Sequence, residues 1–276
     1  MSEVIERTEV LTPGPAIALA GLLDVPLPDL ESEGLPLTWH WLYLLERPQQ
    51  RDLGADGHPL RNAVPAPPGP GRRRMWAGGA VRSLGPLRVG EVASRRSRVL
   101  TTLQKTGRSG RLTFVTVGHT ILQGGVPVVE ERQDLVYRDV VAGRAVPDPG
   151  GGAGTAGRLE IAPEEWSVPV SPSLLFRFSA LTYNGHRIHY DRDYARTEEG
   201  YPGLVVHGPL QATVMAELAR VRGVGGPGVA FEYRLVAPLF EDQGLLVGAV
   251  EQDGVLRTTV RDARGRRTAE GRLEPT

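Results

Sequence analysis

Three of the six histidines in this 276-residue chain lie in one short stretch, at His186, His189 and His207. Gly208 and a proline follow the last of them and precede apolar residues with helical spacing. A loop histidine can accept or donate a proton near neutral pH, and the free amides at a helix start can stabilise a developing anion. These residue types in this order predict a proton-transfer site on residues 178–210.

Three interpretations of the histidines are open on spacing alone. His189 can be a structural histidine whose ring bonds to backbone carbonyls, and spacing by itself favours this interpretation. His186, His189 and His207 can together bind zinc, although no acidic residue stands out as a further ligand. His189 can also perform acid–base chemistry with a polar partner from the same loop.

Composition narrows the classes of function. The 32 basic and 32 acidic residues balance, so the total charge points to neither a nucleic acid partner nor an anionic membrane surface. Cysteine is absent, which excludes disulfides, thiolate nucleophiles and sulfur-ligated zinc and fits a reducing cytoplasm. Lys105 is the sole lysine, and its turn-like surroundings disfavour a Schiff-base mechanism. The apolar run at residues 16–23 is too short to span a bilayer, so a soluble, cytoplasmic protein is predicted.

The first half of the chain predicts a short helix and then strands. A proline-rich start after Thr12 predicts a helix that ends near Asp24. Residues 48–74 lack periodicity and are predicted to form a loop, and loops of this length are often functional. Residues 75–139 carry runs of β-branched and aromatic residues separated by glycines, which is typical of an antiparallel meander.

A Gly- and Pro-rich linker is predicted at residues 142–158. It contains a formal G-x-G-x-x-G, but no strand precedes it and no helix follows it, so a dinucleotide site is disfavoured. Ser171 and a proline then open a helix that is expected to stop near Asn184. A second helix is predicted from Gly208 to Gly223, and further strands follow it.

Two segments resemble each other and suggest an internal repeat. Residues 81–90 align with residues 233–242, with an arginine, a proline and a leucine in register. Each segment follows a helical region and begins a set of strands. The chain is therefore predicted to contain two copies of one α+β unit.

The histidine stretch resembles the hydratase motif of a known superfamily. The motif runs from Asn184 through His189 to Asp191 and continues from Gly203 to Gly208. It is similar to that of MaoC-like, or R-specific enoyl-thioester, hydratases. More closely, it resembles the branch with type 2 3-hydroxyacyl-thioester dehydratases and mesaconyl- or itaconyl-CoA hydratases. The resemblance extends through residues 39–46 and 73–79 and so covers most of the chain.

The resemblance implies an α+β double hot-dog, in which two antiparallel sheets each wrap round a long helix. Residues 1–141 would form a non-catalytic N-terminal hot-dog, residues 142–158 a linker, and residues 159–276 the hot-dog that carries the motif. It also implies a hydratase or dehydratase that adds water to, or removes it from, the α,β double bond of an acyl thioester. The substrate would be an acyl-CoA or an acyl-carrier-protein thioester. No cofactor, metal, nucleic acid or membrane partner is expected, and a homo-oligomer is compatible with the fold.

The resemblance assigns roles to individual residues. His189 matches the catalytic histidine, and Gly208 matches the glycine whose N–H faces the thioester oxygen. Asn184 stands where many members have a catalytic aspartate, so His186 is a candidate for the second acid–base group. Since an amide cannot take a proton, a thioester-binding protein without hydration chemistry is the alternative.

A further set of residues is predicted to bind the substrate. Three consecutive arginines beside a tryptophan suit the phosphates and adenine of CoA, whereas a solvated run of charge is the alternative. The predicted substrate-binding residues are Arg72, Arg73, Arg74, Trp76 and Arg187.

Overall fold

The computed structural model describes residues 3–60, 72–107, 110–139 and 160–276. The predicted linker at residues 142–158 lies outside the described residues. The described strands of the first half are β1 (Ile5–Val10), β2 (Arg72–Ser83), β3 (Val92–Gly107), β4 (Gly110–Gln123) and β5 (Val126–Asp139). Those of the second half are β6 (Trp166–Val168), β7 (Val229–Leu235), β8 (Leu245–Gln252), β9 (Val255–Arg261) and β10 (Arg267–Pro275).

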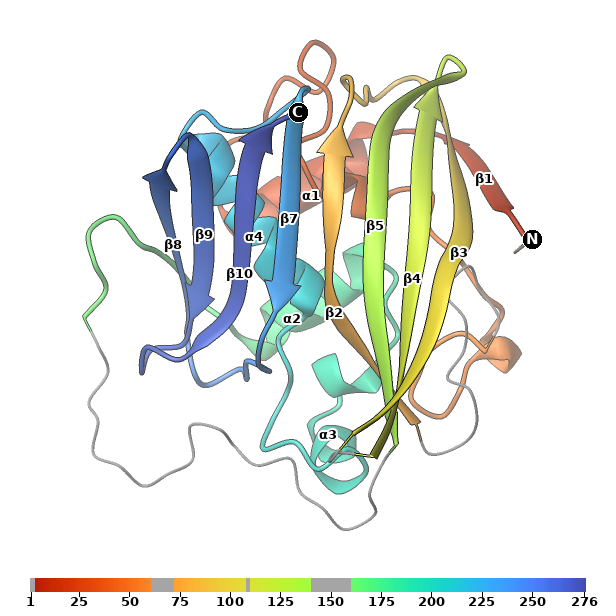
Figure 1. Cartoon of the computed structure of the whole chain (residues 1–276), viewed down its shortest axis with the longest axis vertical. Helices are drawn as coiled ribbons and strands as arrows, with labels where there is room; N and C mark the ends of the chain where they lie inside the picture. The colour runs from red at the N-terminus through yellow and green to blue at the C-terminus, as the bar shows by residue number, and fades with distance from the viewer. Residues whose placement is uncertain (1–2, 61–71, 108–109, 140–159) are drawn as a thin grey trace.

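These strands form one antiparallel sheet in the order β1-β3-β4-β5-β2-β7-β10-β9-β8-β6 (Figure 1). Read outward from the β2–β7 contact, the two halves have the same order of strands. In the β2–β7 ladder, Ala80 pairs with Glu232. The alignment of residues 81–90 with residues 233–242, extended back by one residue, also matches Ala80 with Glu232. Each of the two residues is therefore paired with its own equivalent in the other half. The repeat seen in the sequence is therefore present as a two-fold relation between the halves.

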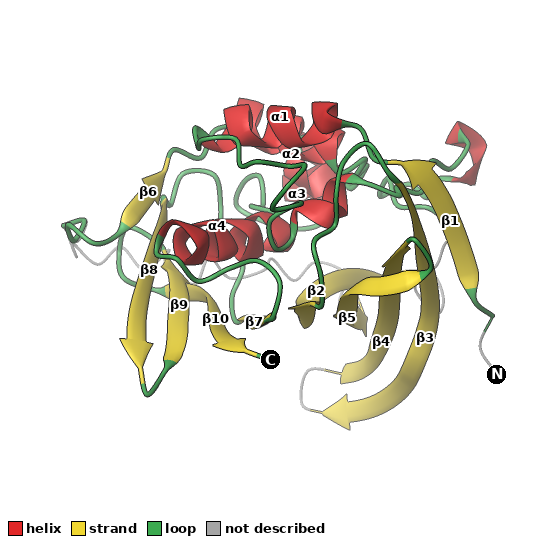
Figure 2. Ribbon diagram, turned by 90° about the horizontal axis from the view of Figure 1, so that it is seen from above, coloured by secondary structure: helices red, strands yellow, loops and turns green. Residues whose placement is uncertain are grey.

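The helices cover one face of the sheet (Figure 2). The α-helices are α1 (Pro13–Leu23), α2 (Pro172–Leu181), α3 (Arg192–Thr197) and α4 (Gly208–Val221). The short 3₁₀ helices are η1 (Trp39–Leu42), η2 (Gln50–Asp52) and η3 (Arg187–His189). Helix α4 packs on the strands of the second half and on β2, whereas α1 packs against α2. No described helix has the length and apolarity needed to cross a membrane.

A buried polar contact joins the two halves. The Nε1–H of Trp39, in the first half, donates a 2.8 Å hydrogen bond to Glu217 on α4. Trp39 and Glu217 are both completely buried. Because a buried carboxylate is costly without partners, the bond from Trp39 ties the first half to α4, while Arg220 of the same helix pairs with the charge of Glu217.

Helix α2 begins where the sequence predicts and ends earlier. The Ser171 hydroxyl accepts the N–H of Leu174, and a proline occupies the first turn. The helix ends at Leu181, not near Asn184, because Tyr183 takes a left-handed conformation with φ of 51°. The N–H of Asn184 then bonds back to the carbonyl of Ser179, which closes the helix end.

Strand β2 begins earlier than the sequence predicts. Residues 72–74 were expected to end a loop, but they pair with β5, with Arg73 opposite Arg138 and Arg74 opposite Tyr137. Residues 72–74 form a strand because they pair with β5, since three arginines have little strand preference of their own. Residues 61–71 of the predicted loop lie outside the described residues.

Candidate active site

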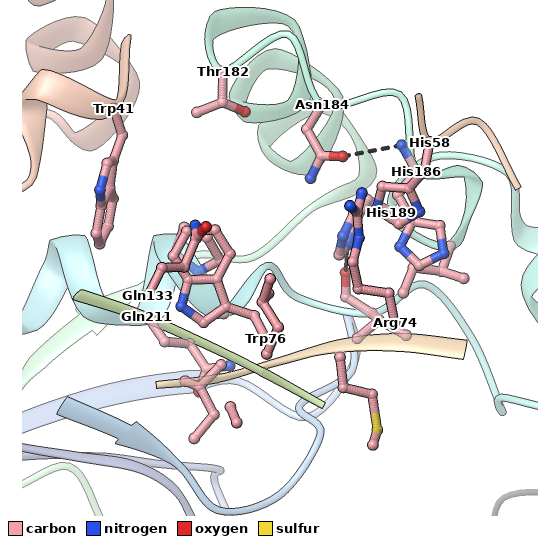
Figure 3. Close-up of a pocket in the computed structure, with 18 of the residues that line it drawn as sticks. Trp41, His58, Arg74, Trp76, Gln133, Thr182, Asn184, His186, His189 and Gln211 are labelled. Carbon is pink, nitrogen blue, oxygen red and sulfur yellow. Dashed lines mark hydrogen bonds between the residues drawn. The ribbon is translucent and has the colours of Figure 1, made fainter. Parts of the chain in front are cut away.

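A cavity of about 580 Å³ opens between the two halves. Its walls come from β2, β4 and β5 of the first half and, in the second half, from residues 182–189, residues 205–211 and the end of β7. Figure 3 shows His58, His186, His189 and Arg74 gathered on one side of it, with Trp41 across the space.

His189 lies at the end of η3, and one of its ring nitrogens already makes a hydrogen bond within the protein. Its Nδ1 is 2.7 Å from the carbonyl oxygen of Val205, which can only accept, so Nδ1 carries the proton. Nε2 is therefore left with a lone pair. Burial lowers the pKa of His189 to about 4, although the bond to Val205 acts in the opposite direction. The ring is thus neutral at physiological pH and is available as a base.

His207 supports this ring. The two imidazoles stack with centroids 3.7 Å apart and planes 18° apart. The Nε2 of His207 bonds to the hydroxyl of Ser179 on α2 at 2.8 Å. Burial holds the pKa of His207 well below its ordinary value. His207 does not line the cavity, so its place is that of a support behind His189.

Asn184 is held by the loop that it begins. Its Oδ1 accepts the backbone N–H of His186 at 3.0 Å. Figure 3 shows its amide nitrogen turned toward the cavity. An aspartate in the same place would keep the bond to His186 and present its second oxygen to the cavity. Asn184 instead presents a hydrogen-bond donor that cannot titrate.

His186 stands between His189 and a histidine of the first half. Its ring centroid lies 5.5 Å from that of His189 and 4.1 Å from that of His58. The Nδ1 of His58 is 2.9 Å from Asp56, so Nδ1 donates to the carboxylate. Burial and the nearby Arg74 lower the pKa of His58 to about 4, against the effect of Asp56. Burial, then His58, holds the pKa of His186 well below its ordinary value.

The segment that carries His58 is clamped to the loop of residues 184–191. The Arg187 backbone N–H donates to the carbonyl of Asp56 at 2.9 Å, and its guanidinium donates to the carbonyl of Ala55 at 3.1 Å. The same guanidinium makes bonds of 3.0 and 2.7 Å to Asp191. The positive-φ Gly57 packs directly on Gly185. Arg187 therefore fixes the relation of two loops and does not line the cavity.

Asp56, His58 and His186 also meet a distance criterion for a metal site. Their candidate ligand atoms lie within 4.8 Å of one another, and this is the one such trio among the described residues. Its chemistry fits a cation poorly, because the carboxylate is occupied by His58 and by a backbone N–H at 3.0 Å. The charge of Arg74 also acts on both histidines and opposes a second cation. The zinc trio considered from spacing lies close together, but its ring nitrogens do not meet the same distance limit, and the rings of His189 and His207 stack face to face.

Gly208 opens α4 at the cavity wall. The side chain of His207 does not cap the helix, and no described carbonyl accepts the N–H of Gly208. That donor is thus available to a ligand. A Cβ at position 208 would lie 2.1 Å from Cδ1 of Leu235, so the lack of a side chain also matters for packing.

The opposite wall of the cavity is aromatic and polar. The indoles of Trp41 and Trp76 meet edge to face at 5.7 Å. Their Nε1–H groups donate to Glu131 at 2.9 Å and to the hydroxyl of Tyr233 at 3.0 Å. Burial acts to raise the pKa of Glu131, but the hydrogen bond and charge of His40, with His119 and Trp41, together lower it to about 2. Glu131 is therefore an anion in the wall.

Comparison with known proteins agrees with this geometry. A family profile described as "Hydroxyacyl-thioester dehydratase type 2" matches residues 38–241. The mesaconyl-C(4)-CoA hydratase of Chloroflexus aurantiacus is 48% identical over 232 residues, which cover 82% of this chain and 79% of the relative. The chain belongs to the type 2 hydroxyacyl-thioester dehydratase family.

Solved structures give the fold of this type 2 dehydratase. A MaoC-like dehydratase of Phytophthora capsici superposes with a TM-score of 0.68 at 15% identity, over all of this chain and 95% of the other. A Mycobacterium tuberculosis protein described as a double hot-dog superposes with a TM-score of 0.52 at 14% identity, over 99% of this chain and 94% of the other. The predicted α+β double hot-dog is confirmed, and its two halves share one continuous sheet.

The predicted class of reaction is also confirmed. The family and the relative are named for removal and addition of water on acyl thioesters, so the type 2 dehydratase is a hydro-lyase of this class. These names favour the enzyme over the binding protein without hydration chemistry.

The predicted substrate-binding residues lie in different places. Arg73 pairs with Glu199 and lies 5.6 Å from the ring of Tyr201. Arg74 and Trp76 face the cavity, and Arg74 lies beside His186 and His189 (Figure 3). Arg72 begins β2. Arg73 lines the same cavity as Arg74, from the adjacent position of the strand.

Sequence reasoning missed Asp56 and His58. They lie in the non-periodic segment of residues 48–74, and the first half was expected to be non-catalytic. An Asp-Gly-His sequence in a long loop was the available signal, since such loops often carry function.

Proposed function

We propose that this dehydratase hydrates a short, branched acyl-CoA of the mesaconyl kind, with His189 as the proton carrier. The observation that carries the mechanism is the bond from His189 to the carbonyl of Val205, which leaves Nε2 as an acceptor. A water held between Nε2 and the Asn184 amide would lie beside the thioester that Gly208 binds.

One proton carrier is enough for the proposed reaction, because His189 takes a proton from water and later returns it to the substrate. The N–H of Gly208 donates to the thioester oxygen and stabilises the enolate-like charge. Water forms a bond to the β-carbon while the Nε2 of His189 takes one of its protons. The electrons of the double bond move to the thioester oxygen. The imidazolium of His189 then returns the proton to the α-carbon, and the enzyme regains its first state.

The lining of the cavity supports a short acyl group. Beyond the catalytic residues the wall includes Arg95, His119, Glu131 and Gln133. These groups make that part of the wall polar, which suits a short polar acyl group better than a long hydrocarbon chain. The name of the 48% identical relative also specifies a short acyl group on CoA. We assign the enzyme to the cytoplasm, in keeping with a chain that has no cysteine.

The test is the absorbance of an unsaturated thioester. Crotonyl-CoA, mesaconyl-CoA and a long-chain enoyl-CoA are incubated with the enzyme and with His189→Ala. We expect the absorbance of the short thioesters to fall with the native enzyme and to stay unchanged with the variant. Steady traces for all three substrates, on CoA and on a carrier protein alike, would contradict the proposal.

A further inference from the structure

Arg74 lies at the catalytic end of the cavity. It comes from the start of β2, lines the cavity, and is grouped with His58, His186 and His189 (Figure 3). The Tyr137 hydroxyl is a hydrogen-bond partner of its guanidinium. The catalytic loop therefore faces a cation that the first half of the chain supplies.

The charge of Arg74 lacks an opposite partner at contact distance. Arg73 pairs with Glu199, and Arg95 lies 4.0 Å from Glu46, but no described carboxylate lies within salt-bridge distance of Arg74. The carboxylate of Asp56 is near, yet it is committed to His58. Burial accordingly lowers the pKa of the Arg74 guanidinium. A guanidinium in such a place favours an incoming anion with two oxygens.

The proposed substrate would carry an anion next to Arg74. In a mesaconyl group joined to CoA through C4, the free carboxylate is attached to the β-carbon. That carbon receives the oxygen of water, so its carboxylate must lie close to the group that activates the water. Arg74 is the lining cation beside His58 and His186, whereas the CoA phosphates lie at the far end of a long pantetheine arm.

We propose that Arg74 binds a free carboxylate on the β-carbon of the acyl group and selects dicarboxylic over monocarboxylic acyl-CoA. This inference rests on the proposed function for its choice of substrate. It replaces the phosphate contact that the sequence predicted for Arg74, while Arg72 and Arg73 keep that prediction. A bidentate pair would also orient the β-carbon toward the water held by His189 and Asn184.

Binding of two inert thioesters tests the subsite without turnover. Succinyl-CoA and butyryl-CoA differ at the β-carbon by a carboxylate and a methyl group, and neither has a double bond or a hydroxyl to react. By calorimetry we expect the native enzyme to bind succinyl-CoA about 10- to 100-fold more tightly, as loss of a charged hydrogen bond implies. Arg74→Gln should remove this preference, and Arg74→Lys should keep part of it.

Arg82→Gln is the matched control. Arg82 lies on the same strand, but its side chain is 52% exposed and pairs with Glu130 at 3.1 Å. The control should keep the full preference for succinyl-CoA. Arg74→Met, which keeps a side chain of similar reach, replaces Arg74→Gln if thermal melting shows that the glutamine variant is unfolded.

The outcomes separate this inference from the proposed function. Equal binding of the two thioesters by the native enzyme, or a preference that survives Arg74→Gln, overturns the carboxylate subsite even if mesaconyl-CoA is hydrated. A preference that Arg74→Gln removes supports the subsite even if no thioester is turned over, and then the proposed function alone fails. In turnover, Arg74→Gln should lower kcat/KM for mesaconyl-CoA by a larger factor than kcat/KM for crotonyl-CoA.

Discussion

The Nδ1 of His189 lies 2.7 Å from the carbonyl oxygen of Val205, and this contact fixes which nitrogen of the ring can act as a base. Val205 precedes α4 by a few residues, so the segment that presents the Gly208 amide also sets the tautomer of His189. In the proposed mechanism, one segment of backbone thus aligns proton transfer by His189 with oxyanion binding by Gly208. A shift of this segment would affect both functions together.

Substitutions at His189 and Asn184 should differ in their effects. His189→Ala removes the proton carrier and should nearly abolish turnover, whereas Asn184→Ala loses one water contact and should cost less. Asn184→Asp should be tolerated or raise kcat, because a carboxylate there keeps the bond to His186 and adds a titrating group. Steady-state kinetics measures this order.

His186→Ala is the comparison variant for the same experiment. It removes the rival histidine and keeps the backbone N–H that Asn184 binds. Equal, near-complete losses in His186→Ala and His189→Ala would mean that two histidines share the chemistry. An active His189→Ala enzyme would remove His189 from the mechanism.

Gly208 should act through its N–H, and a pair of double variants isolates that donor. The clash of a Cβ with Leu235 is relieved by Leu235→Ala. In that background Gly208→Ala keeps the donor and should retain most activity, while Gly208→Pro removes it. The proline variant should lose about 100- to 1,000-fold in kcat, the usual effect of deleting an oxyanion donor. Similar kcat values for the two double variants would argue against this role.

Local sequence signals pointed to the second-half part of the candidate site but not to its first-half part. Ser171, Gly208 and the histidine motif are local signals, and the structure places the ends of α2 and α4 near them. The start of β2 depends on its pairing with β5, which the residue types in the segment do not predict. The position of His58 against His186 depends on how the two halves meet, and the spacing of either segment carries no information about it.

The phosphate contact of Arg72 and Arg73 remains a prediction with a direct test. We expect Arg72→Ala with Arg73→Ala to raise KM for crotonyl-CoA by about 10-fold through loss of charged contacts. KM for crotonyl-pantetheine, which lacks the nucleotide, should not change. Arg82→Ala removes one exposed charge from the same strand and is the control. An unchanged KM for the CoA thioester would support a solvated run of charge instead.

The buried histidines should make stability depend on pH. Burial lowers the pKa values of His58 and His189 to about 4, whereas unfolded histidine titrates at about 6.5. Between these values the unfolded chain binds protons that the folded chain does not. The free energy of unfolding should therefore be full above about pH 6.5 and fall as the pH drops toward about 4.

Urea unfolding at several pH values measures this dependence. His58→Gln removes one of the titrating groups and should make the decline with falling pH less steep. A free energy of unfolding that stayed constant from about pH 7 to about pH 4.5 would contradict the neutral, buried state of these rings.

Gly57 should be required for the geometry of the catalytic loop although it lies in the other half of the chain. Its φ is +87°, and a Cβ there would lie 1.9 Å from the carbonyl oxygen of Gly185. Gly57→Ala should therefore push apart the two loops that Arg187 clamps and displace His186 from His58. Since a shift of about 1 Å can cost about 100-fold in rate, we expect a loss of kcat of that order.

Gly90→Ala controls for backbone strain, because Gly90 has φ of +84° and nothing within 4 Å of the added Cβ. Both variants carry the conformational cost of a positive φ, so equal activity in the two would show that the contact with Gly185 does not position the site.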